Sequence, residues 1–347
     1  MDSSMDLKSM TLEELTDCVM ELGEKKFRAK QIYGWLHQKL VRSPEEMKNV
    51  PAKCIEKLLK EHPFYGVEEV EHYESKIDGT QKFLFSLHDG NMVESVLMKY
   101  KHGNSVCISS QAGCRMGCKF CASTLGGLDR NLTPSEMLSQ IYYIQRDTEE
   151  RVSNVVMMGT GEPMDNYDNV LRFLELITSE AGLNISQRNI TISTCGIVPK
   201  IKELAQKHLQ ITLAISLHSP NDEMRRGLMP IAMKYSIDEL LDACHYYFKE
   251  TNRRMTFEYS LVAGVNDQPV HAEELAGRLK GFPCHVNLIP VNPIKERDFK
   301  QSMPKSVMEF KKILEKNRVN VTIRREMGAD INAACGQLRR KKLQSRL

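Results

Sequence analysis

The stretch GCRMGCKFC, residues 113–121, carries three cysteines with the spacing C-x3-C-x2-C. It follows an apolar stretch, residues 105–109, that predicts a β-strand. Three thiolates on one tight loop, Cys114, Cys118 and Cys121, can bind three irons of a cubane iron–sulfur cluster. The fourth iron then stays open to an external ligand, which a four-cysteine site would not allow. The spacing therefore predicts a cluster that acts chemically on a bound molecule.

The main alternative for this loop is a structural zinc site. Structural zinc usually takes a fourth Cys or His at motif spacing, and the nearest candidates, Cys107, Cys195 and His218, are more remote in the sequence. The chain has 10 cysteines, and its polar N-terminus gives no sign of an export signal. Cysteines in such a chain more often bind metal or react than form disulfides. We therefore expect a reducing compartment, the cytoplasm.

Beyond the cysteine loop, strand and helix patterns alternate over more than half of the chain. Strands are expected at residues 105–109, 154–159, 189–194, 211–217, 255–262 and 285–291, and helices at 133–147, 167–181, 197–207, 236–250 and 268–281. This alternation predicts a parallel sheet, and the continuous apolar strands predict that both of its faces are covered. Six such units favour an α/β fold, a partial (β/α)6 barrel, over a short doubly wound sheet. A last helix, 304–317, precedes a strand at 319–325.

The N-terminal part of the chain has a different pattern. Residues 11–62 read as helical, with a capping box at Thr11 and Glu14 and a stop at Gly23. Ser43, followed by Pro44, is expected to open a third short helix. Strands at 82–87 and 92–100 flank an Asp-Gly turn and predict a hairpin. The expected units are a helical accessory domain (1–64), a β-hairpin linker region (65–104), the barrel (105–300) and a C-terminal extension (301–347).

Length and composition set outer limits on the function. The 347 residues are 41% hydrophobic and 27% charged, which excludes collagen-like and wholly disordered chains. No apolar run reaches the about 18 residues that a membrane span needs, so no membrane partner is expected. The net charge of only +3 neither requires nor excludes a nucleic-acid partner, because clustering matters more than the total. No self-complementary apolar stripe stands out, and a monomer is expected.

With an aromatic residue before its third cysteine, the loop resembles the radical S-adenosylmethionine (radical SAM) signature. Further segments resemble the RlmN/Cfr family of radical SAM RNA adenine methyltransferases, and these matches spread over nearly the whole chain. They are CISSQ (107–111), MGTGEP (158–163), SLH (216–218), DINAACGQL (330–338) and the N-terminal TLEEL (11–15) with FRAKQIYGWLHQK (27–39). The resemblance implies a [4Fe–4S] cluster held by Cys114, Cys118 and Cys121, and two S-adenosylmethionine molecules per turnover.

The family's chemistry requires two cysteines outside the cluster, because C2 of adenine is not nucleophilic. In the family, a C-terminal cysteine is first methylated, a 5′-deoxyadenosyl radical takes a hydrogen from that methyl group, and the carbon radical adds to adenine. A second cysteine then releases the product by forming a disulfide. By resemblance, Cys335 is the methyl carrier and Cys107 the resolving thiol. Glu94 matches the proposed acceptor of the adenine proton, a role suited to a carboxylate.

The resemblance also implies a set of cofactor contacts at strand ends. Gly161 allows close approach of the ligand's amino group, and Glu162 can accept hydrogen bonds from its ammonium. Contacts are further expected from Ser193, Ser216, Leu217, His218 and Asn292. The remaining cysteines, Cys18, Cys54, Cys195, Cys244 and Cys284, match no functional position and are expected to be structural.

The implied partners are 23S rRNA, certain tRNAs and an electron donor such as flavodoxin or ferredoxin. Two basic clusters suit phosphate binding. They are Lys25, Lys26, Arg28, Lys30 and Lys39 near the start, and Arg339, Arg340, Lys341, Lys342 and Arg346 at the end. No stacking-sheet RNA motif is visible, so recognition of RNA shape and of an exposed or flipped adenine is expected.

Two other functions stay open at this level. A Cfr-type enzyme would methylate C8 of the same ribosomal adenosine and cause antibiotic resistance. Pro163 favours the RlmN side, since Cfr proteins typically have Ala there. A non-enzymatic iron–sulfur protein that binds RNA or transfers electrons is the alternative of another class, and the open iron position argues against it.

Overall fold

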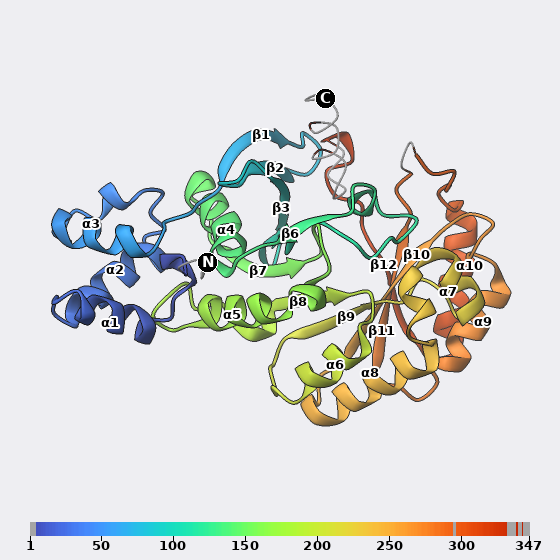
Figure 1. Ribbon diagram of the computed structural model, residues 1–347. Coiled ribbons are helices and arrows are strands. Elements are labelled where there is room, and N and C mark those ends of the chain that lie inside the picture. The colour runs from blue at the N-terminus through green and yellow to red at the C-terminus, as the bar shows by residue number, and fades with distance from the viewer. Residues whose placement is uncertain (1–4, 294–295, 332–337, 339–341, 343–347) are drawn as a thin grey trace.

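A ten-stranded mixed sheet forms the centre of the molecule (Figure 1). A computed structural model of the chain describes residues 5–293, 296–331, 338 and 342. The strands lie in the order β1-β2-β3-β4-β7-β8-β9-β10-β11-β12. Their bounds are β1 Glu68–Glu74, β2 Gln81–Ser86, β3 Met92–Tyr100, β4 Gly103–Cys107, β7 Val152–Met157, β8 Ile190–Thr194, β9 Thr212–Ser216, β10 Met255–Leu261, β11 Cys284–Pro290 and β12 Asn320–Ile323.

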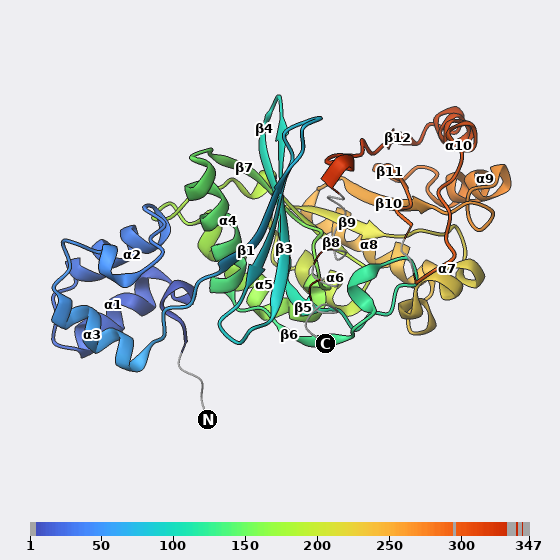
Figure 2. The same ribbon diagram turned by 90° about the horizontal axis from the view of Figure 1, so that it is seen from above.

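In this sheet, β4 and the strands β7 to β12 are all parallel and form the open barrel. Helices follow these strands and lie on the outer face of the curved sheet (Figures 1 and 2). They are α4 Pro134–Thr148, α5 Tyr167–Thr178, α6 Val198–Ala205, α7 Asp222–Leu228, α8 Ile237–Thr251, α9 Pro269–Arg278 and α10 Pro304–Lys316. The six predicted parallel strands and their helices are confirmed, and β12 adds a seventh strand beside β11.

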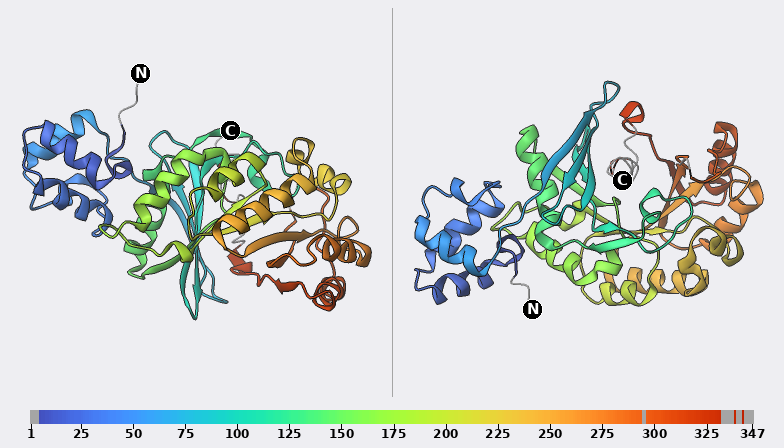
Figure 3. Two further views of the ribbon diagram at one scale, coloured as in Figure 1. Left: turned by 90° about the horizontal axis from the view of Figure 1, so that it is seen from below. Right: turned by 45° about the horizontal axis from the view of Figure 1, so that its top comes forward.

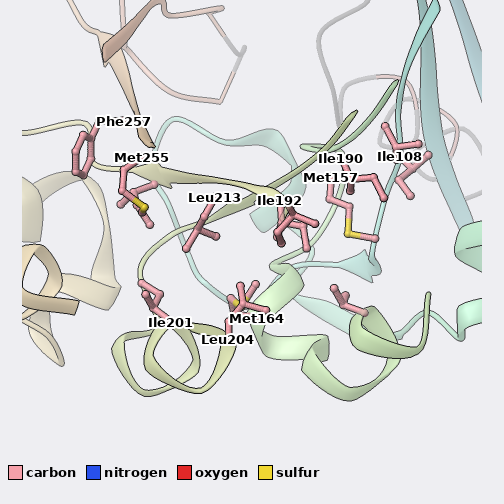
Figure 4. Close-up of a cluster of buried hydrophobic side chains, with 14 of the residues drawn as sticks. Ile108, Met157, Met164, Ile190, Ile192, Ile201, Leu204, Leu213, Met255 and Phe257 are labelled. Atoms are coloured by element: carbon pink, nitrogen blue, oxygen red, sulfur yellow. The ribbon is translucent and has the colours of Figure 1, made fainter. Parts of the chain in front are cut away.

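The main core lies between the sheet and these helices. Figure 4 shows Ile192 of β8 and Leu213 of β9 above Ile201 and Leu204 of α6. All four side chains are at most 1% exposed. Burial of one such side chain contributes about 1.5–3 kcal/mol to the stability of the fold. The packing of the helices on the strands therefore holds the parallel strands together, with their carboxyl ends at one edge of the sheet.

Strands β1 to β3 form an antiparallel meander that extends the same sheet. The predicted hairpin is β2 and β3, which are joined by the turn around Gly90. Strand β1 was not predicted, because its sequence EEVEHYE is polar and mostly exposed and has no hydrophobic alternation. Pairing of β3 with β4 sets Val96 opposite Cys107.

Three N-terminal helices, α1 Leu12–Glu21, α2 Phe27–His37 and α3 Ala52–Glu61, pack around their own apolar core. The capping box at Thr11 and Glu14 is present. Ser43 opens a short helix as predicted, with a capping box formed by Ser43 and Glu46, but this helix is not the third α-helix. Residues Pro44–Glu46 form only a short 3-10 turn, and α3 begins after Pro51, because a proline suits the start of a helix better than its interior.

The helical module lies against α4 and α5 (Figure 1). Lys8 Nζ donates to Ser139 Oγ over 2.9 Å, and Arg172 forms a bidentate ion pair with Glu14 at 2.7 and 3.1 Å. His37 Nδ1 lies 2.8 Å from the Tyr142 hydroxyl. These contacts join the module to the helices of the barrel.

Several short elements complete the fold. Strands β5 (Gln111–Gly113) and β6 (Leu128–Asn131) form a separate antiparallel pair that frames the cysteine loop. The short 3-10 helices are Leu7–Ser9, Pro44–Glu46, Ala122–Thr124, Pro163–Asn166, Gln187–Asn189, Pro230–Met233 and Ala329–Ile331. Among the described residues, no helix combines the length and apolar character needed to cross a bilayer.

Candidate active site

The cysteine loop is held in place by backbone hydrogen bonds on both sides. Cys114 N–H donates to Gly127 O over 2.7 Å, and Lys119 N–H donates to Leu228 O over 2.9 Å. Cys114 and Cys118 are buried, and Cys121 is half-buried. The loop is therefore fixed between β6 and the end of α7, with its thiols turned mainly toward the interior.

The three thiols lie in an apolar environment and influence one another. Burial raises the pKa of Cys114 to about 12, and the neighbouring Cys121 adds to this rise. Burial raises the pKa of Cys118 as well, again with contributions from Cys121 and Cys114. Side chains of Met116, Phe120, Leu228 and Met229 pack around Cys118. Thiolates at these positions need positive charge beside them, and the iron ions of a cluster would supply it.

The positions of the thiols bear on the choice between a cluster and a single zinc ion. In the described part of the chain, the one trio of ligand atoms within 4.8 Å of one another is Glu69, His72 and Asp147, all exposed. The three loop thiols therefore do not all lie within 4.8 Å of one another, which is compatible with a cluster between them. Cys195 packs against Cys118, but its thiol hydrogen-bonds to the Glu162 carboxylate and is not free as a fourth ligand.

Gly161 and Glu162 follow β7 and approach the loop that carries the cysteines. Gly161 has φ +113°, and a Cβ there would lie 2.6 Å from the Gln111 Cβ, so only glycine fits. Glu162 N–H donates to Gln111 Oε1 over 2.8 Å. The Glu162 carboxylate is buried and accepts from Met164 N–H at 3.0 Å and Cys195 N–H at 2.7 Å. It therefore joins the loops after β7 and β8.

The predicted contacts on β8 and β9 lie side by side. Ser193 and Ser216 hydroxyl oxygens are 3.4 Å apart across the two strands. Leu217 follows at the end of β9 and is buried, whereas Asn292, after β11, is exposed. The structure thus brings the two serines together at one strand edge and leaves Asn292 at the surface.

His218 has an unusual backbone and a defined tautomer. Its φ is +57°, in the left-handed region that a non-glycine residue rarely adopts. Ser260 N–H donates to His218 Nδ1 over 2.8 Å, so the proton of the neutral ring is on Nε2. Burial lowers the pKa of His218 to about 3, which keeps the ring neutral at pH 7. Its ring makes an edge contact with Phe120 of the cysteine loop, with centroids 4.7 Å apart.

Cys107 and Glu94 share one face of the sheet. Glu94 lies two residues before Val96 on β3, and Val96 pairs with Cys107 on β4, so the three side chains point the same way. Cys107 is 3% exposed and packs with Val96 and Met98. Glu94 is 1% exposed, and its carboxylate lies 2.9 Å from the Lys82 ammonium of β2.

The C-terminal segment reaches this same face. Met327 and Ile331 pack against the cluster of Val96, Met98 and Cys107. The predicted carrier Cys335 lies outside the described residues, as do Arg339, Arg340, Lys341 and Arg346 of the basic tail.

The segment is bonded to the turn between β1 and β2, beside which Figure 3 draws residues 329–331 in red. Asp330 Oδ1 accepts from Ser75 Oγ at 2.6 Å, Asp330 Oδ2 accepts from Lys76 N–H at 3.0 Å, and Gly328 N–H donates to Asp78 Oδ2 at 3.0 Å. Farther along, Lys342 Nζ lies 2.6 Å from Glu71 Oε1 of β1. We call the contacts of Ser75, Lys76 and Asp78 with Gly328 and Asp330 the turn clamp.

Sequence reasoning missed two residues of this region. Lys82 reads as an ordinary surface lysine in KFLFSL, because its partner Glu94 becomes visible only through the pairing of β2 with β3. Arg225 reads as part of a charged segment, yet its guanidinium is completely buried near Cys195. No local sequence signal marks either residue.

Comparisons with known proteins agree with this geometry. The family model of the radical SAM superfamily matches residues 108–276, and the ribosomal RNA large subunit methyltransferase N-terminal domain matches residues 5–62. A probable dual-specificity RNA methyltransferase RlmN of Lachnoclostridium phytofermentans is 64% identical, over 97% of this chain and 94% of that protein. One of Clostridium novyi is 57% identical, over 96% and 98%.

A solved structure shows the same fold. The crystal structure of a radical SAM methyltransferase from Sphaerobacter thermophilus superimposes with a TM-score of 0.92 and 41% sequence identity, over 96% of this chain and 98% of that one. The identity to these relatives extends over nearly the full length of both chains. This chain therefore belongs to the RlmN family of radical SAM methyltransferases.

Proposed function

We propose that this protein methylates C2 of adenosine in 23S rRNA, at the peptidyl transferase centre, and in the tRNA anticodon loop. The relatives above carry dual-specificity RNA methyltransferase in their names. The structural observation that carries the proposal is the buried Cys107, which shares a sheet face with Glu94 and is packed by the segment that leads to Cys335.

The residues at the strand ends suit the two cofactors of this chemistry. Cys114, Cys118 and Cys121 fit a [4Fe–4S] cluster, because their thiols share one loop, do not all lie within 4.8 Å of one another and lie among apolar side chains. When bound, the cluster and two S-adenosylmethionine molecules per turnover supply a methyl group for Cys335 and a hydrogen-abstracting radical.

Several residues are assigned to orienting S-adenosylmethionine. Gly161 leaves room for the ligand beside the chain, and the buried Glu162 holds this loop against Cys195. Ser193 and Ser216 offer neighbouring hydroxyls, and His218 offers an Nε2–H donor. Leu217 and Asn292 complete the proposed contacts, with Asn292 reaching the ligand from the exposed end of β11.

Two side chains complete the reaction on the RNA. Glu94, whose carboxylate lies 2.9 Å from the Lys82 ammonium, accepts the C2 proton of the adenine adduct. The adduct also carries an unpaired electron, which would pass to the oxidised cluster held by Cys114, Cys118 and Cys121. The Cys107 thiolate then attacks the Cys335 sulfur. The new S–S bond forms as the S–C bond to the methylated adenine breaks, and the electron pair moves to the departing carbon, which takes a proton. A reductant must then reduce the disulfide before the next turnover.

The proposed partners are 23S rRNA and tRNA, with flavodoxin or ferredoxin as the electron donor, and the protein is assigned as a cytoplasmic monomer. Lys25, Lys26, Lys30 and Lys39 are exposed on the helical module and suit contacts with phosphates. Arg28 is half-buried, and its guanidinium donates to Asn49 O.

The function is tested by nucleoside analysis. Reconstituted full-length protein is incubated with an rRNA fragment or tRNA, S-adenosylmethionine and a reductant, and the digested RNA is examined by mass spectrometry beside 2-methyl- and 8-methyladenosine standards. We expect 2-methyladenosine from the wild type and none from Cys335→Ala, while both proteins still cleave S-adenosylmethionine to 5′-deoxyadenosine.

Three results would overturn parts of the proposal. Product that elutes with 8-methyladenosine would make the protein a Cfr-type enzyme. Normal methylation by Cys335→Ala would remove Cys335 as the carrier. A wild-type protein that holds a cluster but never cleaves S-adenosylmethionine would fit a non-enzymatic iron–sulfur protein.

A further inference from the structure

Helix α7 packs directly against the cysteine loop. Its last residue, Leu228, accepts the hydrogen bond from Lys119 N–H at 2.9 Å, and Leu228 and Met229 pack on Cys118. Two arginines follow each other on this helix. Arg226 is exposed, whereas the side chain of Arg225 points inward and is 0% exposed. The helix thus brings one guanidinium into the interior behind the loop.

The Arg225 guanidinium is bonded only to neutral carbonyl groups. Nη2 donates to Cys195 O at 2.7 Å and to Ser216 O at 3.3 Å, and Nε donates to Leu217 O at 3.2 Å. Within the part of the chain that the structure describes, no carboxylate forms an ion pair with it, and its buried Nη1 has no hydrogen-bond partner. These bonds tie the ends of β8 and β9 together.

A buried cation without a counter-charge is costly, so a partner of opposite charge is expected close by. Arg225 Nη2 donates to the carbonyl oxygen of Cys195, and the Cys195 side chain packs with Cys118, a proposed iron ligand. Asp222 at the start of α7 forms no ion pair with Arg225 among the described residues. The iron–sulfur cluster that Cys118 would hold is therefore a negative group placed behind the segment to which Arg225 is bonded.

We propose that Arg225 is a positioning residue of the iron–sulfur centre, whose buried charge raises the reduction potential of the cluster. An added electron makes a thiolate-bound cluster more negative, so a fixed cation stabilises the reduced form more than the oxidised form. Its carbonyl bonds also hold Ser216 and Leu217 at the strand edge assigned to S-adenosylmethionine. This inference rests on the cluster ligands given under the proposed function.

The test compares substitutions at the two neighbouring arginines. Full-length reconstituted wild type, Arg225→Gln, Arg225→Lys and Arg226→Gln are reduced stepwise without S-adenosylmethionine, and the reduced cluster is followed by electron paramagnetic resonance. We expect a more negative midpoint potential for Arg225→Gln. Arg225→Lys keeps the charge and is expected to stay at the wild-type potential, and the exposed Arg226→Gln serves as the matched control.

An unchanged potential in cluster-loaded Arg225→Gln would overturn the inference, as would an equal shift in Arg226→Gln. If Arg225→Gln does not retain its cluster, Arg225→Lys decides the test. This variant keeps the positive charge, so a midpoint potential clearly more negative than that of the wild type would contradict an electrostatic role of Arg225. Iron and sulfide analysis of the wild type separates the two proposals. A wild type that binds no [4Fe–4S] cluster contradicts the proposed function itself, whereas a loaded cluster without a shift contradicts only the role of Arg225.

Discussion

At the scale of single residues, the side chains of the proposed chemistry lie at two places in the sheet. Cys107 and Glu94 lie on the β3–β4 face, and the cysteine loop lies at the carboxyl end of β4. Six residues, 108–113, separate the end of β4 from Cys114, so a short connection links both parts. The Cys107 thiol is only 3% exposed, so oxidants in the solvent have little access to it. It can react with a group that is held next to it on this face of the sheet.

Substitution of the resolving thiol tests this division of labour. In Cys107→Ala, the methylene bridge between Cys335 and adenine has no thiol to break it, so we expect the RNA to stay covalently attached to the protein. Denaturing gel electrophoresis with labelled RNA measures the adduct. Cys107→Ala/Cys335→Ala is expected to show none, and Cys244→Ala, at a buried thiol of α8, is expected to release methylated RNA normally. Free methylated RNA from Cys107→Ala would contradict the role of Cys107.

Residue-level prediction from sequence succeeded where a motif is local and failed where a partner is distant. The cysteine spacing and Gly161 are readable from a few adjacent letters. The ion pair of Lys82 with Glu94 depends on the register of β2 against β3, and the burial of Arg225 depends on where α7 packs. Neither the ion pair nor the burial of Arg225 can be predicted from the neighbouring residues in the sequence. The roles of Cys335, Cys107 and the cofactor contacts remain predictions.

At the scale of elements, the turn between β1 and β2 connects the meander to the C-terminal segment. The turn clamp has three hydrogen bonds, two of them to the Asp330 carboxylate. Hydrogen bonds to a charged carboxylate are stronger than those between neutral groups. The turn therefore fixes where the chain enters the segment that contains Cys335.

Removal of the clamp is expected to impair methylation more than radical formation. In Asp330→Asn, we expect methylation of RNA to fall several-fold, because a neutral amide binds Ser75 and Lys76 less strongly than a carboxylate does. Cleavage of S-adenosylmethionine should continue, and mass spectrometry of the Cys335 peptide reports how much carrier is methylated. Asp89→Asn removes a similar carboxylate at the turn between β2 and β3 and serves as the control. An equal loss in both variants would contradict a specific clamp.

Elements with a strong periodic pattern were predictable, and short or polar ones were not. Helix α8 runs over Ile237–Thr251, one residue from its predicted bounds, because Ser236 and Glu239 form a capping box before an apolar stripe. Strand β1 and helix α7 lack such patterns and were missed. Their positions depend on neighbours, since β1 pairs with β2 and α7 packs on the cysteine loop.

At the scale of the whole molecule, the helical module is joined to the barrel through buried polar groups. His37 and Lys8 are both buried at this contact, and each has a partner on α4. Burial lowers the pKa of His37 to about 3, from an ordinary value of 6.5. A neutral His37 thus stabilises the folded protein above pH 6.5, and this contribution is lost as the pH falls from 6.5 toward 3.

The pH dependence of stability tests this contact. We expect the free energy of unfolding to decrease below pH 6.5 by up to about 1.4 kcal/mol per pH unit for one such group. His37→Gln is expected to flatten this dependence, while the control His62→Gln, at a half-buried histidine of the same module, leaves it unchanged. Urea unfolding followed by the fluorescence of Trp35, the single tryptophan and a residue of the module, provides the measurement. The same slope in wild type and His37→Gln would contradict the burial of a neutral His37.

The architecture of the barrel was the most predictable feature at this scale, because a chain in which strands and helices alternate can pack in only a few ways, most of them with a parallel sheet covered by helices. The extension of the sheet by β1–β3 and the contact of residues 327–331 with Cys107 were not predictable, since both join segments far apart in the sequence. The domain boundaries at 64, 104 and 300 remain predictions.

The central claim is that the methyl group passes through Cys335 before it reaches adenine C2. Its most direct test uses S-adenosylmethionine with a fully deuterated methyl group, followed by mass spectrometry of the digested RNA. Passage through the carrier removes one deuterium from the methyl group before it joins the ring, so we predict 2-methyladenosine that carries two deuterium atoms and 5′-deoxyadenosine that carries one. A product that retains all three deuterium atoms would mean direct methyl transfer and would contradict the claim.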